Sequence, residues 1–432
     1  MSILTIALVA LFVLFLIGVP IYAALLISSM LALFFSDTLP LAVVQGSLFD
    51  GLNIFPLLAI PCFIVAGKLM ERGNITQDII DVVKMLVGRL YGGIGITTIL
   101  GCTFFAAISG SGTSTVAAVG AVMIPAMIRN NYSRTYAGAV AATGGTIGIL
   151  IPPSNPMIIY AIICNVSVTG MFTAGFLPGF IMAFCLSVVA WLLARHHGFR
   201  ADEGAEPFSA GAFLKTCRRA FFSLATVIIV LGSIYSGMAT PVEASVVAVL
   251  WALFVGVVVN RALSIKDIYD SFLEGAIVCG SIMIIVGAST LFGKILTYEE
   301  APARLANAVV AFTHNKYLVM LLIVGLLYIL GMFMETLAMI ILVAPVLVPM
   351  LHILEINPIH FGIVMIMANE TGLLTPPMGV NLFVSSRLTG VSVERLAVAV
   401  LPYLLAMALV TLLIVFVEPI STILPTLLGY NY

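Results

Sequence analysis

Two proline pairs set 224 residues apart decide the fold of this chain. The first half contains GILIPPSN at residues 148–155, and the second half contains GLLTPPMGVN at residues 372–381. Pro125 and Pro349 keep the same spacing. We infer that one structural unit occurs twice and that each copy carries a backbone break inside an apolar segment. In a membrane, broken helices at corresponding positions of two repeats are typical of a transporter's binding site.

The composition places this chain in a membrane. Hydrophobic residues make up 62% of the 432 residues and charged residues only 9%, whereas a soluble domain carries about 25% charged residues. The net charge of −1 argues against a nucleic acid partner. The sequence has no metalloprotease, nucleotide-binding or serine-hydrolase motif, so it predicts neither an enzyme nor a nucleotide or transition-metal cofactor. We predict an all-α polytopic membrane protein embedded in the lipid bilayer.

The charges predict two inverted repeats. Residues 195–219 form the longest polar stretch and are rich in basic residues, so the positive-inside rule makes them a cytoplasmic linker. The first repeat then covers residues 1–194 and the second covers residues 220–432. Counting crossings outward from the linker leaves 3 of the 18 Lys and Arg residues outside and 15 inside. Residues 3–36 are either one kinked helix or two short helices, and we favour two, with the N-terminus outside.

Each repeat is expected to contain an arm at the membrane interface, a re-entrant helical hairpin and a broken transmembrane helix. In the first repeat we expect the arm at 68–89, the hairpin at about 97–128 and the broken helix at about 135–165. In the second repeat we expect the arm at 294–316, the hairpin at about 318–350 and the broken helix at about 357–385. The arms could instead be ordinary loops outside the membrane. As interfacial arms, they would link a fixed part of the molecule to a moving part.

The polar stretch SGSGTS at residues 109–114 is predicted to be the tip of the first hairpin. A glycine-rich break at this depth frees backbone carbonyls and points hydroxyl groups into a cavity, and such oxygens suit a hard cation such as Na⁺. Helix N-termini at the same place favour an anionic substrate. The alternative is helix packing through small residues.

The first proline pair lies between TGGTIG at residues 143–148 and the polar residues Ser154 and Asn155. Two prolines remove two amide donors, so carbonyl groups upstream lose their helical partners and can join a cation shell. Substrate contact is the functional interpretation of Ser154 and Asn155, and a simple proline kink is the structural one.

The second repeat varies the same plan. Its hairpin tip is GMFMET at residues 331–336, and its broken helix supplies Thr371 and Thr375, so a second cation site is expected. Glu335 and Glu370 are acidic residues in an apolar region, which points to function. They could instead cap half-helices or pair with each other, and proton coupling through them stays open.

These motifs resemble those of the DctM-type large membrane subunit of tripartite ATP-independent periplasmic (TRAP) transporters. The resemblance covers essentially the whole chain and is carried by residues 104–115, 142–154 and 369–381. It implies Na⁺-coupled uptake of an organic acid, of the sialic acid or C4-dicarboxylate type, across a bacterial inner membrane by an elevator mechanism. It also implies two partners, a small four-helix DctQ-type membrane subunit and a periplasmic substrate-binding protein.

The resemblance assigns expected sites to individual residues. One Na⁺ site would involve Ser109, Ser111, Gly145 and Pro152, and the other Gly331, Thr371, Thr375 and Met378. No arginine in the core motifs could clamp a carboxylate, so the expected substrate-binding residues are Gly112, Thr113, Pro153, Ser154, Asn155 and Asn381. A stand-alone Na⁺-coupled transporter for dicarboxylates or citrate is the alternative function; a channel and an intramembrane enzyme are weaker alternatives.

Overall fold

The computed structural model describes residues 3–36, 40–199 and 209–430, and this part of the chain is helical without a strand. The first half contains α1 Ile3–Leu16, α2 Ile21–Phe34, α3 Ala42–Leu52, η1 Phe55–Leu58, α4 Ala59–Arg72, α5 Ile75–Val87, α6 Gly93–Ser109, α7 Gly112–Arg129, α8 Arg134–Thr146, η2 Ile147–Ile149, α9 Asn155–Ile163 and α10 Val168–His196. The second half contains α11 Ala210–Arg219, α12 Phe221–Tyr235, α13 Pro241–Leu253, η3 Phe254–Val259, α14 Ile265–Tyr298, α15 Ala301–Phe312, α16 Lys316–Gly331, α17 Thr336–Ile353, α18 Pro358–Leu373, α19 Val380–Thr389, α20 Val393–Ala399, α21 Leu401–Phe416 and α22 Pro419–Leu427.

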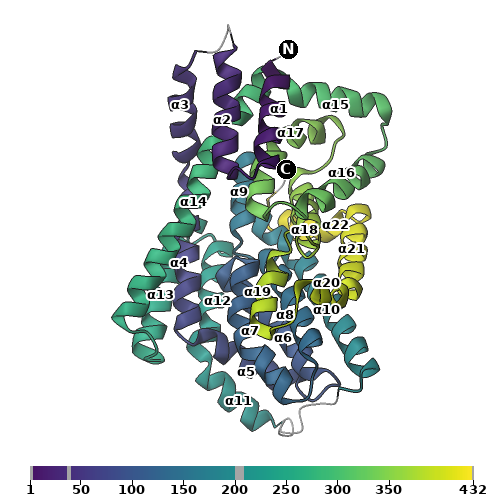
Figure 1. Ribbon diagram of the computed structural model, residues 1–432. Coiled ribbons are helices and arrows are strands. Elements are labelled where there is room, and N and C mark those ends of the chain that lie inside the picture. The colour runs from purple at the N-terminus through teal and green to yellow at the C-terminus, as the bar shows by residue number, and fades with distance from the viewer. Residues whose placement is uncertain (1–2, 37–39, 200–208, 431–432) are drawn as a thin grey trace.

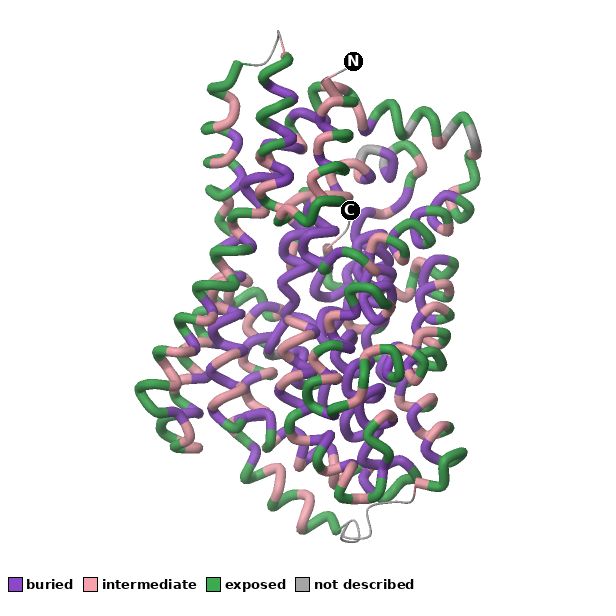
Figure 2. The backbone as a smooth tube through the Cα atoms, in the orientation of Figure 1, coloured by how far each residue is buried: buried purple, intermediate pink, exposed green. Residues whose placement is uncertain are grey.

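Helices long and apolar enough to cross a bilayer make this a multi-pass membrane protein. In the described residues, four helices meet that requirement, and up to seven spans result if each of three bent helix pairs counts as one. Figure 2 shows buried backbone at the centre and exposed backbone on the outer helices. The outer helices expose large apolar side chains such as Phe184 and Ile228, as a hydrocarbon solvent allows.

The order of helices in the first half recurs in the second. In the first half, α5 is the arm, α6 and α7 form the hairpin, and α8 and α9 are the two parts of the broken helix. In the second half, α15, the pair α16 and α17, and the pair α18 and α19 follow in the same order. The counterpart of α14, a single helix of 34 residues, is the pair α3 and α4, which is bent by 60° at the break near η1. Residues 3–36 form two packed helices, α1 and α2, separated at residues 17–20.

The two halves exchange helices reciprocally at the centre. α9 of the first half packs against α17 of the second, and α19 of the second half packs against α7 and α8 of the first. Reciprocal contact of this kind is what a two-fold relation between equivalent units produces. The exchange brings both proline breaks into one central block, and it places α19 beside the tip of the first hairpin.

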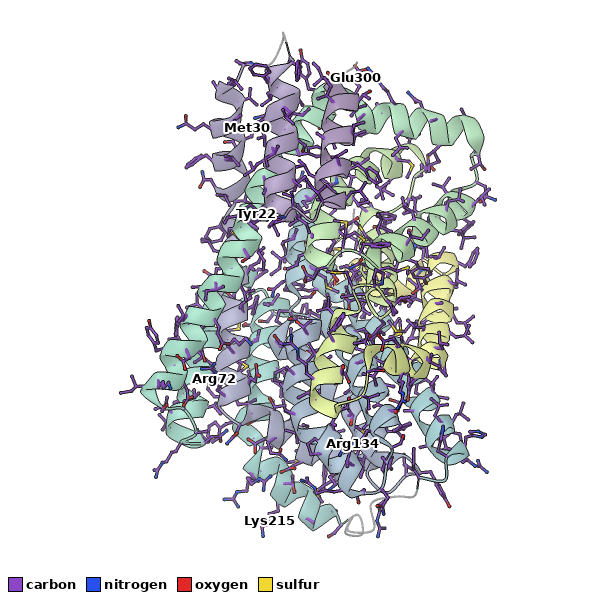
Figure 3. The ribbon with its side chains drawn as sticks, viewed as in Figure 1. Tyr22, Met30, Arg72, Arg134, Lys215 and Glu300 are labelled. Atoms are coloured by element: carbon purple, nitrogen blue, oxygen red, sulfur yellow. The ribbon has the colours of Figure 1, made fainter. Side chains whose placement is uncertain are left out.

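A second set of helices flanks this block. α14 packs against α2, α3 and α4, and α13 packs against α4; Figure 1 shows these helices along one side of the molecule. Arg72 at the end of α4 joins α14 through Glu274, with 2.6 Å between the guanidinium nitrogen and the carboxylate oxygen. Figure 3 shows Arg72, Arg134 and Lys215 in the lower half of the view and Glu300 at the top.

The expected arm boundaries were wrong at their starts. Residue 68 lies inside α4, which continues to Arg72, and α5 begins only after a turn in which Asn74 has a φ of 61°. Residue 294 lies inside α14, which ends at Tyr298 before Glu300 adopts a φ of 54°. Left-handed residues end both long helices because they stop the helical hydrogen-bond pattern. The short helices α5 and α15 that follow lie at opposite ends of the molecule (Figure 1).

The expected linker, 195–219, is more structured than a loop. α10 continues into it as far as His196, and α11 occupies Ala210–Arg219, while residues 200–208 lie outside the described residues. α11 packs against α5, and Arg219 forms an ion pair with Asp81 of α5. The linker therefore contacts the arm of the first repeat.

Candidate functional site

The tip of the first hairpin gathers hydroxyl groups. α6 ends at Ser109 and α7 begins at Gly112, with Gly110 in the left-handed region at a φ of 57°. The Thr115 hydroxyl donates to the Ser111 carbonyl at 2.8 Å and lies 2.9 Å from the Ser109 hydroxyl oxygen. The Ser111 and Thr113 hydroxyl oxygens are 3.3 Å apart. This tip presents neutral oxygens, the ligand type that a hard monovalent cation prefers.

The first proline break lies directly against this tip. A Cβ atom added to Gly112 would be 3.1 Å from the Gly145 carbonyl oxygen, and one added to Gly148 would be 2.9 Å from the Thr115 hydroxyl oxygen. Only glycine permits these approaches of backbone to backbone and hydroxyl. Of the expected Na⁺ ligands, Ser109 and Ser111 thus contact Thr115, a residue that the sequence-based assignment did not include. Gly145 lies against Gly112 of the same tip. Pro152 is buried in the same break.

The second break and the second hairpin meet through glycine and through a polar cluster. A Cβ atom added to Gly372 would be 2.5 Å from the Tyr328 carbonyl oxygen and 2.9 Å from the Gly331 Cα. The Thr336 hydroxyl donates to the Glu370 carboxylate and accepts from the Asn369 side-chain amide at 2.7 Å. Each repeat thus fastens its hairpin tip to its own broken helix.

The expected ligands of the second Na⁺ site lie around this contact. Gly331 lies close to Asn369: a Cβ atom added to Gly331 would be 2.8 Å from the Asn369 carbonyl oxygen. The Thr371 hydroxyl donates to the Met367 carbonyl at 2.8 Å, so its oxygen lone pairs remain available. The Thr375 amide donates to Gly372, and the Met378 amide donates to Met332. The carbonyl groups of the opened turn are therefore the main oxygen source here.

A cavity of about 150 Å³ lies where the first hairpin tip, α9 and α19 meet the flanking helices α4 and α14. Four expected substrate residues line it: Gly112, Thr113, Asn155 and Asn381. The other two, Pro153 and Ser154, are fully buried behind it and do not line it.

Buried amide groups without partners line this cavity. Asn381 is fully buried, and both its side-chain oxygen and nitrogen lack a hydrogen-bond partner in the structure. The Asn155 side-chain oxygen, at 4% residue exposure, also lacks one. A buried polar atom without a partner costs about 1–3 kcal/mol, so these atoms fit a role in binding a polar ligand.

The cavity also contains residues that sequence reasoning did not assign to it. Lys68 of α4 and Glu335 of the second hairpin are lining residues. The sequence placed Lys68 in an interfacial arm, because a basic residue near the end of an apolar run is usually interfacial. The sequence left the role of Glu335 open and did not place it at this cavity. Only the packing of the flanking helices against the block could reveal either position.

Comparison with known proteins identifies the group to which this architecture is related. A family profile described as "Tripartite ATP-independent periplasmic transporter, DctM component" matches residues 8–420. The isethionate TRAP transporter permease protein DctMQ of Oleidesulfovibrio alaskensis is 36% identical over 95% of this chain. The matched part covers 64% of the length of that relative, which is the longer protein. The C4-dicarboxylate TRAP transporter large permease protein DctM of Pseudomonas aeruginosa is 36% identical over 89% of each chain.

A third relative and one solved structure complete the comparison. The sialic acid TRAP transporter large permease protein SiaM of Vibrio cholerae is 33% identical over 96% of both chains. The crystal structure of the YdaH transporter of Alcanivorax borkumensis has a TM-score of 0.61 and covers 90% of this chain and 88% of its own, at 14% identity. That likeness shows a shared fold.

Proposed function

This chain belongs to the DctM component family of the tripartite ATP-independent periplasmic transporters, and we propose that it carries an organic acid across the bacterial inner membrane, driven by Na⁺. One observation carries the proposal. Both hairpin tips meet both proline breaks in one central block, beside a cavity lined by unpartnered amide groups. This is the arrangement in which broken helices bind a substrate and its coupling ions at mid-membrane.

Two Na⁺ sites follow from the two tips. In the first, Ser109, Ser111, Gly145 and Pro152 would supply oxygens, with Thr115 hydrogen-bonded to Ser109 and Ser111. In the second, Gly331, Thr371, Thr375 and Met378 would do so, mostly through carbonyl groups. Neutral oxygens alone suit a monovalent hard cation, whereas transition metals select imidazole or thiolate ligands. In the described residues, no cluster of three or more His, Cys, Asp or Glu residues could hold a metal ion.

The proposed movement is that of an elevator. The hairpins and broken helices form one packed block. Beside it, α13 and α14 both pack on α4, and an ion pair joins α4 to α14. α5 and α15 lie at opposite ends (Figure 1), which supports inverted repeats, and each would serve as an arm between the block and the frame of flanking helices. Movement of the block past the frame would then carry the cavity across the membrane.

The proposed partners are a small four-helix membrane subunit of the DctQ type and a periplasmic substrate-binding protein. The name of the Oleidesulfovibrio relative, DctMQ, and its greater length support a small membrane partner for this chain. The end bearing Arg134 and Lys215 in Figure 3 would face the cytoplasm by the positive-inside rule. The binding protein would dock at the opposite end, above α1 and α15.

Uptake into proteoliposomes tests this function. The chain, its small subunit and its cognate binding protein would be reconstituted, and radiolabelled organic acids supplied with and without an inward Na⁺ gradient. We expect uptake that requires both Na⁺ and the binding protein. Na⁺-driven uptake without a binding protein would instead indicate a stand-alone transporter, and uptake indifferent to Na⁺ would contradict the proposal.

A further inference from the structure

The charges in the cavity point to the chemistry of the ligand. Among its described lining residues, only Lys68 and Glu335 carry a charge, and they belong to different parts of the molecule. We propose that the cavity takes a short molecule with one anionic group and, at its other end, a hydrogen-bond donor, a hydroxyl or ammonium group. The proposal rests on the proposed transport function and names the substrate class for that site.

Size is the first argument. The cavity of about 150 Å³ matches the volume of an engineered protein cavity that binds benzene. A ligand of roughly five to eight non-hydrogen atoms fills such a space. A sugar acid such as sialic acid is far larger, so it would need a cavity reshaped well beyond this one.

Lys68 is placed to meet the anionic group. Its ammonium nitrogen lies 3.6 Å from a Glu71 oxygen and 3.5 Å from a Glu274 oxygen. Both distances exceed the 2.7–2.9 Å of a close charge-assisted hydrogen bond. Glu274 instead makes its close contact, at 2.6 Å, with Arg72. The Lys68 ammonium is therefore loosely held and can turn to a ligand anion without losing a tight ion pair.

Glu335 is placed to meet a donor. It precedes the first residue of α17 and lines the cavity, so its carboxylate oxygens are acceptors there. The Asn381 side-chain amide, whose oxygen and nitrogen both lack a partner, lines the same cavity. A hydroxyl or ammonium group of the ligand can donate to these oxygens. A second carboxylate at that end would meet a like charge, which is unfavourable.

Comparison of the two repeats supports a role for Glu335 in recognising the ligand. The residue 224 positions earlier is Ser111, which lies in the first hairpin tip and also lines the cavity. The two tips therefore present different groups to the same space, a hydroxyl from one and an acidic group from the other. A symmetric ion site would not need this difference, whereas an asymmetric ligand does.

Ligand protection of the purified membrane complex tests the class without selection by the binding protein. The midpoint of thermal unfolding would be measured in Na⁺ with equal concentrations of propionate, 3-hydroxypropionate, β-alanine, succinate or N-acetylneuraminate. We expect 3-hydroxypropionate or β-alanine to stabilise most, propionate less because it lacks the donor, and succinate and N-acetylneuraminate least. Preferential stabilisation by succinate or N-acetylneuraminate, or by none of the five, would overturn the proposal.

Two pairs of variants tie the result to the named residues. Glu335→Gln should shift preference toward succinate by about tenfold, whereas Glu355→Gln, beyond the other end of α17, should not. Lys68→Gln should weaken binding of every anion about tenfold and Lys68→Arg should largely restore it, with Lys294→Gln on α14 as control. Unchanged preference in Glu335→Gln would overturn the assignment.

The uptake assay separates the two proposals. If Na⁺-driven uptake occurs but the preferred cargo is a dicarboxylate or a sugar acid, the substrate class is wrong and the transport function stands. If no organic acid is taken up in response to Na⁺, the transport function itself fails.

Discussion

The two proline breaks share a motif but lie in different surroundings. Every residue from Ile147 to Tyr160 is buried, whereas Pro376, Pro377 and Met378 are exposed. The helix that covers the first break, α10, is one continuous helix of 29 residues. Its counterpart is split into α20 and α21, which bend by 52°. The same Pro-Pro motif is therefore buried in the first repeat and exposed in the second, depending on the helix that packs over it.

The hairpin tips differ in the same way. In the first hairpin, α6 and α7 pack closely on each other, whereas in the second, α16 packs mainly on α18, and α17 packs on α9 and α15. Thr336 ties the second tip to its break, while the residue 224 positions earlier, Gly112, has no side chain to do so. The second tip therefore relies on side-chain hydrogen bonds where the first relies on close backbone contact.

The largest expected effect is on thiol accessibility at equivalent positions of the two breaks. In a background without the native cysteines, Met378→Cys should react readily with a small hydrophilic thiol reagent, because Met378 is 41% exposed. Ser154→Cys, 224 positions earlier, should react at least about 100-fold more slowly, since a buried thiol must wait for local opening. Equal rates would remove the difference between the exposed and the buried break.

The next largest effect concerns backbone contact at the second break. Gly372→Ala forces a Cβ to within 2.5 Å of the Tyr328 carbonyl, so we expect a loss of about 1–3 kcal/mol of stability and a severe loss of Na⁺-driven uptake. Gly325→Ala in α16 is the matched control, because a Cβ there meets nothing within 4 Å. A thermal unfolding midpoint equal in both variants would show that the tip and the break do not need this contact.

A smaller effect is expected at the polar tie of the second tip. Thr336→Val keeps the shape of the side chain but leaves Glu370 and Asn369 without their hydroxyl partner, at a cost of about 1–3 kcal/mol. Thr336→Ser should retain most of the stability. Thermal unfolding of both variants distinguishes them, and a Val variant as stable as the Ser variant would mean that the tie is dispensable.

The part of this architecture that could be predicted from the sequence is the part set by glycine and proline residues within apolar helices. Glycine and proline interrupt apolar helices wherever they occur, so the ranges of both hairpins and both breaks can be read from the chain itself. The meeting of Gly112 with Asn381 depends on the exchange of α9 and α19 between halves, which no local pattern encodes. The position of Lys68 at the cavity and the exposure of Met378 likewise depend on which distant helix packs nearby.

The most direct test of the account is a count of bound Na⁺ ions. Radioactive Na⁺ binding to the purified membrane complex should show two sites. Ser111→Ala and Thr375→Ala should each raise the half-saturating Na⁺ concentration of one site by roughly 2- to 10-fold, since each removes a hydroxyl oxygen worth about 0.5–1.5 kcal/mol. Ser281→Ala in α14 should change nothing, because that exposed hydroxyl donates to its own helix. Unaltered Na⁺ binding in both site variants would contradict the claim that each repeat builds one cation site.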